Sequence, residues 1–524
     1  DLKYIFIQRN SLWGTLPELA FSPEIYALNI GFNEIEGQIS LPDSLPNLQY
    51  YNVAYNRLNG IVPDFSSTPN LTHLFLEHNY FSGSLPDFSG CGRLKMLDAC
   101  HNNFSDTLPR FLNCDSLTYI DLDYNDFDGS LPDLNHLSHL IHLDLYSNNF
   151  SGPMTGFDSL TNLQFINLNL NQLDGPIPDF EGFDSLDVFA ACCNNLDGPL
   201  PDFKSPGLKV IVVNNNTLSD TIPALGSLNG IDSLKLHNNN ISGLIPVTLP
   251  LTQGARVQLG GNRLTGFSQN IDTSVFLSLS HFDISENKII TLPHGMASFF
   301  NANHVNVSTN LLNYDDLEPN AALGTDSLSC IGQFGISLQK SGDTIYASAG
   351  GTIDSLTYHW YINGQPVDTI VGDSIYVPLD TRSGDYQCVV YNSIIPQATV
   401  YSDTLYFTPR HCASQDSLQL VELFNALNGP AWTLPVTWMN APLSNVPVIQ
   451  MDTSGCYVES LTIDGGGLSG GVPDIDLPRL RNLHLTNAGI TGFADFSRLR
   501  QLEVFDLSGN QISGPLVDLG SWVD

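Results

Sequence analysis

Apolar residues recur along most of the chain in one spacing, with aliphatic or aromatic residues at positions one, four and six and asparagine at position nine. One copy reads Leu71-Thr-His-Leu74-Phe-Leu76-Glu-His-Asn79. The asparagine returns every 22–25 residues from Asn10 to Asn310, which gives fourteen copies. A second block has Gly466, Ala488 and Asn510 in the same phase and adds three. The alternation around positions four and six predicts one short strand per copy, and stacked copies would form a parallel sheet on the concave side.

The spacing, continued by Gly-x-Leu/Ile-Pro, resembles the plant-type leucine-rich repeat, a form also found in secreted bacterial proteins. The resemblance implies an α/β-type solenoid of short parallel strands, with loops or 3-10 turns on its convex side. Residues 1–324 and 458–524 carry the repeats. We expect the repeated asparagine to lie inside each turn and to satisfy backbone groups of the adjacent coil.

Between residues 325 and 411 the period stops, and short alternating segments separated by turns predict a β-sandwich. Trp360, together with Tyr386 two residues before Cys388, resembles an immunoglobulin-like domain. The chain departs from that family on the early strand, where Ile345-Tyr-Ala347 stands in place of a cysteine.

Residues 412–457 contain an amphipathic pattern from Asp416 to Gly429 that predicts a helix, followed by Trp432 and Trp438. This arrangement resembles the helical N-terminal cap of plant-type leucine-rich repeat domains. In the printed order the cap follows fourteen repeats instead of preceding them.

Joining the two ends of the sequence restores the repeat, because the step from Asn510 through Asp524 to Asn10 is 24 residues. We therefore expect a unit of a tandem array, or a subunit that docks head to tail with copies of itself into a fibre. A cut fragment is the third interpretation. The self-assembly ends would involve Leu2, Ile5, Ile7, Leu516, Leu519 and Trp522.

Charge narrows the class of partner. The chain has 54 acidic and 19 basic residues and a net charge of −35, which disfavours nucleic acid and anionic membranes. No apolar run is long enough to span a membrane, so no membrane insertion is expected. Catalytic signatures such as G-x-S-x-G, H-E-x-x-H and a P-loop are absent, and we expect no enzyme and no cofactor.

Carboxylates and aromatic residues fall between the strand leucines of successive coils, where the concave face is expected. Asp98, Asp121 and Asp144 occupy one phase and would form a ladder of like charges. Such a patch suits a basic peptide, a sugar or Ca²⁺; alternatively, aspartate is simply common and solvated at this phase. The candidate ligand-binding residues are Tyr50, His73, Phe75, Asp98, Tyr119, Asp121, Asp123, His142, Asp144 and Tyr146.

A second acidic row follows the Leu-Pro step and could be bridged by Ca²⁺ or serve solubility alone. Its members are Asp43, Asp64, Asp87, Asp133, Asp179, Asp202 and Asp474.

The nine cysteines leave at least one thiol unpaired. Cys91 and Cys114 fall at a core phase and are expected to be buried thiols. The disulfide candidates are Cys330, Cys388, Cys412 and Cys456. Sequons and Asp-Ser/Thr-aliphatic triplets give the glycosylation candidates Asn70, Asn103, Asn149, Asn215, Asn240, Asn306, Ser116, Thr344, Ser374 and Thr404.

Together these features predict an extracellular protein, secreted or at the cell surface, that is structural or adhesive and repeats head to tail in a filament. The alternative is a ligand-binding ectodomain that recognises a peptide or glycan, or a surface protein, on the concave face.

Overall fold

A computed structural model gives the fold of the chain. It describes residues 2–16, 24–41, 45–246, 248–268, 279–293, 304–323, 328–341, 344–372, 374–376, 384–407, 413–427, 448–452, 457–465, 467–493, 499 and 501–513.

One parallel sheet runs along the repeats and contains fifteen strands. In order they are β1 (Tyr4–Phe6), β3 (Ala27–Asn29), β5 (Tyr50–Asn52), β7 (His73–Phe75), β9 (Met96–Asp98), β11 (Tyr119–Asp121), β13 (His142–Asp144), β15 (Phe165–Asn167), β17 (Val188–Ala190), β19 (Val210–Val212), β20 (Ile231–Lys235), β22 (Leu251–Gln258), β24 (His281–Asp283), β25 (Val305–Asn306) and β26 (Leu328–Ser329). The predicted solenoid of short parallel strands is confirmed. We call this sheet the main sheet.

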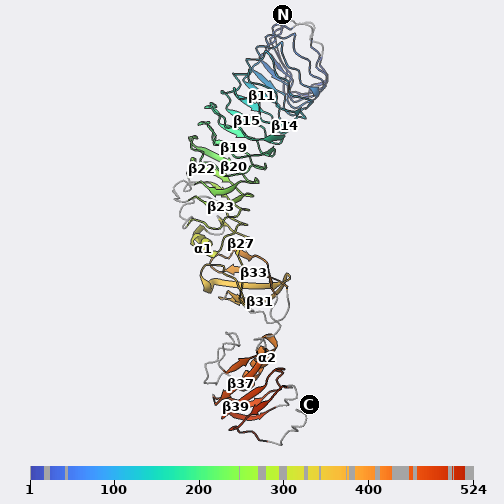
Figure 1. The fold of residues 1–524 in the computed structure, drawn as a ribbon. Coiled ribbons are helices and arrows are strands. Elements are labelled where there is room, and N and C mark those ends of the chain that lie inside the picture. The colour runs from blue at the N-terminus through green and yellow to red at the C-terminus, as the bar shows by residue number, and fades with distance from the viewer. Residues whose placement is uncertain are drawn as a thin grey trace.

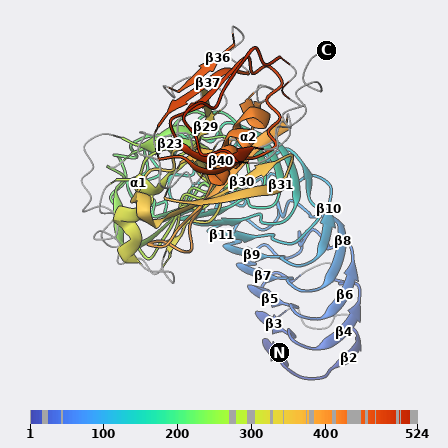
Figure 2. The ribbon, with the colours of Figure 1, turned by 90° about the horizontal axis from the view of Figure 1, so that it is seen from below.

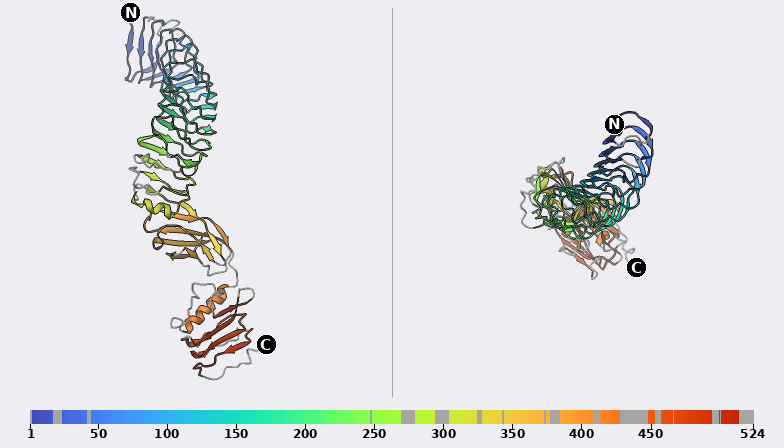
Figure 3. Two further views of the ribbon diagram at one scale, coloured as in Figure 1. Left: turned by 60° about the vertical axis from the view of Figure 1, so that its left-hand side comes forward. Right: turned by 90° about the horizontal axis from the view of Figure 1, so that it is seen from above.

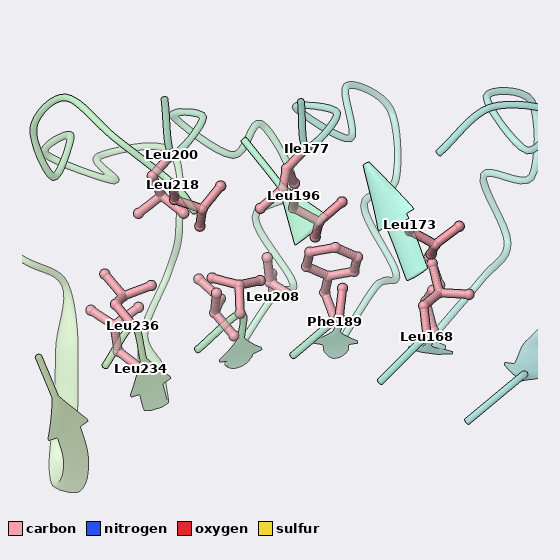
Figure 4. Packing of buried hydrophobic residues seen from close by; sticks show 14 of the residues in the cluster. Leu168, Leu173, Ile177, Phe189, Leu196, Leu200, Leu208, Leu218, Leu234 and Leu236 are labelled. Atoms are coloured by element: carbon pink, nitrogen blue, oxygen red, sulfur yellow. The ribbon is translucent and has the colours of Figure 1, made fainter. Parts of the chain in front are cut away.

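Shorter parallel sheets line the opposite side of the coils, as Figure 2 shows for β2 to β10. They consist of β2 (Trp13–Thr15), β4 (Glu34–Gly37), β6 (Arg57–Gly60), β8 (Tyr80–Ser84) and β10 (Asn103–Ser105); of β12 (Asp128–Gly129), β14 (Asn149–Pro153), β16 (Gln172–Gly175) and β18 (Asn195–Leu196); and of β21 (Ser242–Ile245) and β23 (Arg263–Phe267). Leucines from the two sides meet between them and are buried, including Leu168, Leu173 and Leu196 (Figure 4).

The repeated asparagine ties each coil to its neighbours, as the sequence predicts. Asn102 Nδ2 donates to the carbonyls of Leu76 at 3.1 Å and Ala99 at 3.3 Å. Its Oδ1 accepts the backbone N–H of Phe81 at 3.0 Å. The same set recurs at Asn125 and in coil after coil. We call these residues the asparagine ladder.

The solenoid continues past residue 324, where the sequence pattern places its end. β26 pairs with β25 in the main sheet. Gln333 then takes the place of the ladder asparagine, because its Nε2 donates to Val307 O at 2.8 Å and Cys330 O at 3.2 Å. The pattern missed this fifteenth coil because glutamine replaces asparagine and Cys330 stands at a leucine position.

Two sheets follow and pack face to face, with Trp360 stacked on Tyr376 at 4.9 Å between ring centroids. The larger sheet contains β27 (Gln333–Ile336), β34 (Thr399–Ser402), β33 (Gly384–Asn392), β30 (Leu356–Ile362), β31 (Gln365–Val371) and β35 (Leu405–Phe407). The smaller contains β28 (Gln339–Ser341), β29 (Thr344–Tyr346) and β32 (Ile375–Tyr376). The short helices are α1 (Tyr314–Leu317), η3 (Glu318–Leu323) and η4 (Ile353–Ser355). The buried residues of the two sheets and of α1 belong to the same hydrophobic core as those of the repeats.

A second block has its own core. Helix α2 (Ala413–Ala426) lies where the pattern predicts a helix and buries Leu420 and Leu423. Its sheets contain β36 (Ile449–Met451), β37 (Val458–Asp464), β39 (Asn482–Thr486) and β41 (Val504–Asp506), and β38 (Ser469–Val472) with β40 (Gly489–Phe493). The first coil and this block lie at opposite ends of an elongated, curved molecule (Figures 1 and 3). Among the described helices, none is long and apolar enough to cross a membrane.

Candidate functional site

The main sheet brings the ten candidate residues onto five adjacent coils. Strand register places Asp98 beside Asp121, and Asp121 beside Asp144. Tyr119 pairs with His142 in the same way. Tyr50, His73 and Phe75 lie on the neighbouring strands β5 and β7, while Asp123 and Tyr146 follow β11 and β13. We call the open face of β5, β7, β9, β11 and β13 the carboxylate face.

Hydrogen bonds hold the carboxylates of this face in fixed orientations. The Tyr119 hydroxyl donates to Asp121 Oδ2 at 3.0 Å. Asn167 Nδ2 donates to Asp144 Oδ2 at 3.1 Å. The remaining oxygen of each carboxylate accepts a backbone N–H two residues ahead, at 3.2 Å for Asp121 and 3.0 Å for Asp144. The side chains are therefore positioned before any ligand arrives.

Burial destabilises the charged form of several carboxylates on the carboxylate face. It raises the pKa of Asp98, Asp123 and Asp144 to about 6, and neighbouring carboxylates, Asp121 foremost, add to the effect. Burial, with Asp98 beside it, raises the pKa of Glu77 to about 8. Within the described residues, no lysine or arginine forms an ion pair with Asp98, Asp121 or Asp144.

Aromatic rings on this face stack on one another. The His142 ring lies between Tyr119 and Phe165, with centroid separations of 4.3 and 4.4 Å. A second stack, which sequence reasoning missed, runs through the residue just before each ladder asparagine. Its rings, 4.1 to 4.3 Å apart, are Phe32, Tyr55, His78, His101 and Tyr124.

The missed stack has a detectable signal, since its members recur at the 23-residue period. Each residue has a left-handed backbone, for example φ of 54° at His78 and 50° at His101. Because this backbone conformation is the same in each coil, the rings of successive coils stack face to face. Because ring faces cover one another, mainly ring edges are left for a ligand, which disfavours stacking of a sugar.

The open face of the main sheet changes character along the solenoid. Beyond the carboxylate face it carries Val188, Ala190, Val210 and Val212 on β17 and β19. Lys235 on β20 and Arg256 on β22 follow. The face is thus acidic on β9 to β13, apolar on β17 and β19, and basic at Lys235 and Arg256, while the next strand, β24, carries Asp283.

The second acidic row has a local role. Asp64 and Asp87 each accept the backbone N–H two residues ahead, at 2.9 Å, and Asp133 does so at 3.1 Å. Asp179 accepts in the same way at 3.2 Å. These aspartates shape the turns after the Leu-Pro step. Asp43 lies outside the described residues.

The structure corrects the disulfide expectation for two cysteines. Cys330 and Cys388 are free, buried thiols. Cys388 lies opposite Trp360 in its own sheet, and the facing sheet offers Ile345 and no thiol. Cys91 and Cys114 are free and buried, as expected. Cys412 and Cys456 lie outside the described residues.

The glycosylation candidates and the candidate assembly residues differ in their exposure. Asn103, Asn149, Asn215 and Thr404 are exposed, and the half-buried candidates are Asn70, Asn240, Asn306, Ser116, Thr344 and Ser374. Of the assembly residues, Leu2 and Ile7 are exposed and Ile5 is half-buried, whereas the others lie outside the described residues: Leu516, Leu519 and Trp522.

The repeats are similar to a known protein family. The family model described as Leucine Rich Repeat matches residues 70–91 and 501–522. No curated protein sequence matches the chain. The chain contains leucine-rich repeats, and its fold is a leucine-rich repeat solenoid.

Two solved structures share this fold. The plant peptide hormone receptor RGFR1 in complex with RGF2 is 21% identical with a TM-score of 0.53; the alignment covers 97% of this chain and 63% of that one. The Arabidopsis receptor kinase HAESA, in complex with the peptide hormone IDA and the co-receptor SERK1, is 18% identical with a TM-score of 0.55, covering 97% and 74%. This chain therefore spans less than two thirds of the first receptor's chain.

Proposed function

We propose that this protein is an extracellular, non-enzymatic binding protein that holds an extended basic peptide on the carboxylate face. The observation that carries the proposal is the in-register row Asp98, Asp121 and Asp144, which lacks a lysine or arginine partner among the described residues. Positive side chains of a ligand would relieve the repulsion within this row.

Two further features support a peptide. The row is followed by an apolar stretch and then by Lys235 and Arg256, so an extended chain with a basic end would have one preferred direction. The two solved structures that share the fold are complexes with peptide hormones, which agrees with this ligand class. The stacked rings make a glycan the less favoured ligand.

Fluorescence anisotropy with labelled hexapeptides, one rich in arginine and lysine and one rich in glutamate, tests this proposal. We expect only the basic peptide to bind, and its affinity to fall at least ~10-fold in the triple variant Asp98→Asn, Asp121→Asn, Asp144→Asn, since each close charge pair contributes about 1 kcal/mol or more.

The matched control is Asp64→Asn, Asp87→Asn, Asp202→Asn, which changes the net charge equally on another edge of the coils. Asparagine keeps the turn-forming oxygen at Asp64 and Asp87. Equal losses in the two triple variants, or equal binding of the acidic peptide, would contradict a peptide site on the carboxylate face.

Head-to-tail assembly is a second candidate, favoured by one observation. The first coil presents a cluster of exposed apolar side chains, with Tyr4 58%, Phe6 57% and Trp13 85% exposed. We propose that another coil packs on this surface: either the coil around β41 of another copy, as in an adhesive filament of the bacterial secreted kind, or that of an adjoining unit in a tandem array.

Sedimentation velocity and negative-stain electron microscopy test this assembly. Filaments that grow with concentration and vanish in Trp13→Asp, but persist in the control Ile61→Asp, would support it; Ile61 is 68% exposed on another coil. A monomer at every concentration would refute it.

Two finer assignments of the fold are also proposed. The two sheets of strands β27 to β35, which follow the fifteenth coil, would be an immunoglobulin-like domain, because Trp360 is buried between them and β27 pairs parallel to β34 while the other pairs of these sheets are antiparallel. Helix α2 would be a cap, because Leu423 shares a core with β37 and β39. Faster hydrogen exchange of β37 in Leu423→Asp would support the cap, and a different strand order in a crystal structure would refute the domain.

A further inference from the structure

Three side chains of different chemistry converge on the carboxylate face. Asp121, on β11, and His142 and Asp144, on β13, each offer a ligand atom, and these atoms lie within 4.8 Å of one another. A shared strand pair holds them, because Asp121 pairs with Asp144. The group therefore rests on regular structure and not on a loop.

The imidazole of this group is held in place but has no partner of its own. Tyr119 and Phe165 clamp its ring from both sides at interplanar angles of 8° and 3°. In the described part of the chain, neither ring nitrogen of His142 forms a hydrogen bond. A neutral imidazole ring with such a free nitrogen lone pair is a common metal ligand.

Supporting hydrogen bonds reach both carboxylates of the group. Tyr119 and Asn167 each donate to one oxygen, at 3.0 and 3.1 Å, and backbone amides hold the others. Outer partners of this kind orient ligands in known metal sites. They also leave each carboxylate oxygen with further lone-pair capacity.

Two buried oxygens beside strands β7 and β11 also accept no hydrogen bond, and His101 Nε2 lies 4.0 Å from the one of Asp123. Asp123 Oδ1 and Glu77 Oε2 are inaccessible to solvent and have no hydrogen-bond partner. A second trio, Asp98, Cys100 and Asp121, shares Asp121 with the first, and its ligand atoms also lie within 4.8 Å of one another.

We propose that Asp121, His142 and Asp144 bind a divalent transition-metal ion of the zinc class. One imidazole nitrogen with two carboxylate oxygens suits this class, whereas Ca²⁺ and Mg²⁺ prefer oxygen ligands alone. Three protein ligands leave a coordination position open for water or a group of a bound partner. The site goes beyond the proposed peptide binding and does not depend on it.

Calorimetric titration of the full chain with ZnCl₂, without peptide, tests the site. We expect saturable binding of one ion and at least a ~10-fold loss of affinity in His142→Gln, comparable to the 10–100-fold effects of removing supporting residues in known sites. The matched control His139→Gln removes an exposed histidine and should bind zinc as the unchanged protein does.

A second variant and a second metal keep the result clear of folding defects. Asp144→Asn should also lose zinc, while its circular dichroism spectrum stays unchanged. Co²⁺ should give visible absorption bands that His142→Gln alters. Absence of zinc binding, undiminished binding in His142→Gln, or tighter binding of CaCl₂ than ZnCl₂ would each overturn the proposal.

Discussion

At the scale of single residues, one asparagine side chain per coil forms hydrogen bonds with several backbone groups. A ladder asparagine such as Asn102 uses its amide hydrogens and its oxygen to join its own coil to the preceding one, and it is buried while doing so. The sequence pattern predicts this role because the asparagine recurs at the same position in coil after coil. It does not predict Gln333, whose longer side chain donates to the equivalent carbonyls, those of Val307 and Cys330.

The substitution Asn102→Ala should destabilise the protein by about 2–4 kcal/mol, because three buried backbone groups in two adjacent coils lose their partners. Urea unfolding followed by circular dichroism measures the loss. The control Asn103→Ala changes an exposed neighbour and should shift stability by less than about 0.5 kcal/mol. Equal effects at the two positions would contradict the ladder's role.

Asp416 should make stability depend on pH. It is 1% exposed, its Oδ2 accepts the Val458 N–H at 2.7 Å, and burial raises its pKa to about 6. A raised folded pKa means that the folded state binds the proton more tightly. Stability from this group is therefore present below pH 4 and is lost as the pH rises toward 6.

Asp416→Asn should remove that loss, since the amide keeps the acceptor without the charge. We expect the variant to gain about 1–2 kcal/mol over the unchanged protein at pH 7 and nothing at pH 4. Urea unfolding at the two pH values checks this. A gain of the same size at pH 4 would show that the charge is not the cause.

At the scale of elements, helix α1 and the adjoining 3-10 helix η3 connect the solenoid to the two sheets that follow. The Tyr314 hydroxyl is buried and donates to Val390 O at 2.8 Å, with Ala398 O at 3.2 Å. Glu318 accepts from the Thr352 N–H at 2.8 Å and from Asn392 Nδ2 at 2.6 Å. Sequence reasoning missed this junction, because its partners lie up to 84 residues apart and share no period.

Tyr314→Phe should weaken the junction by about 1–2 kcal/mol, because the one buried hydroxyl hydrogen that the Val390 and Ala398 carbonyls share is lost. Differential scanning calorimetry should show a lower melting temperature for the transition that includes the sheets. Tyr346→Phe, at a 38% exposed tyrosine, is the control and should leave the transition in place. An unchanged melting temperature in Tyr314→Phe would show that the hydroxyl is dispensable.

At the scale of the whole molecule, the repeat period explains which features the sequence predicts, and contacts between coils explain which features it does not. The solenoid, the rows of aspartates and the helix at α2 follow from spacing, which is a property of one segment at a time. The stacked rings beside the ladder and the convergence on His142 depend on how one coil sits on the next. That geometry is set by backbone conformation, such as the positive φ of His101, and not by residue type alone.

Because the strands of the main sheet lie across the long axis, the hydrogen bonds between coils point along it. A force that pulls the two ends apart would load these hydrogen bonds and release the coils one at a time, starting from an end. Each released coil of 23 residues should lengthen the chain by about 70–75 Å. Single-molecule force spectroscopy should record steps of that size, and one abrupt rupture of the whole solenoid would show a different mechanical design. Such a chain would extend under load at a surface and absorb work gradually, because rupture spreads over fifteen coils.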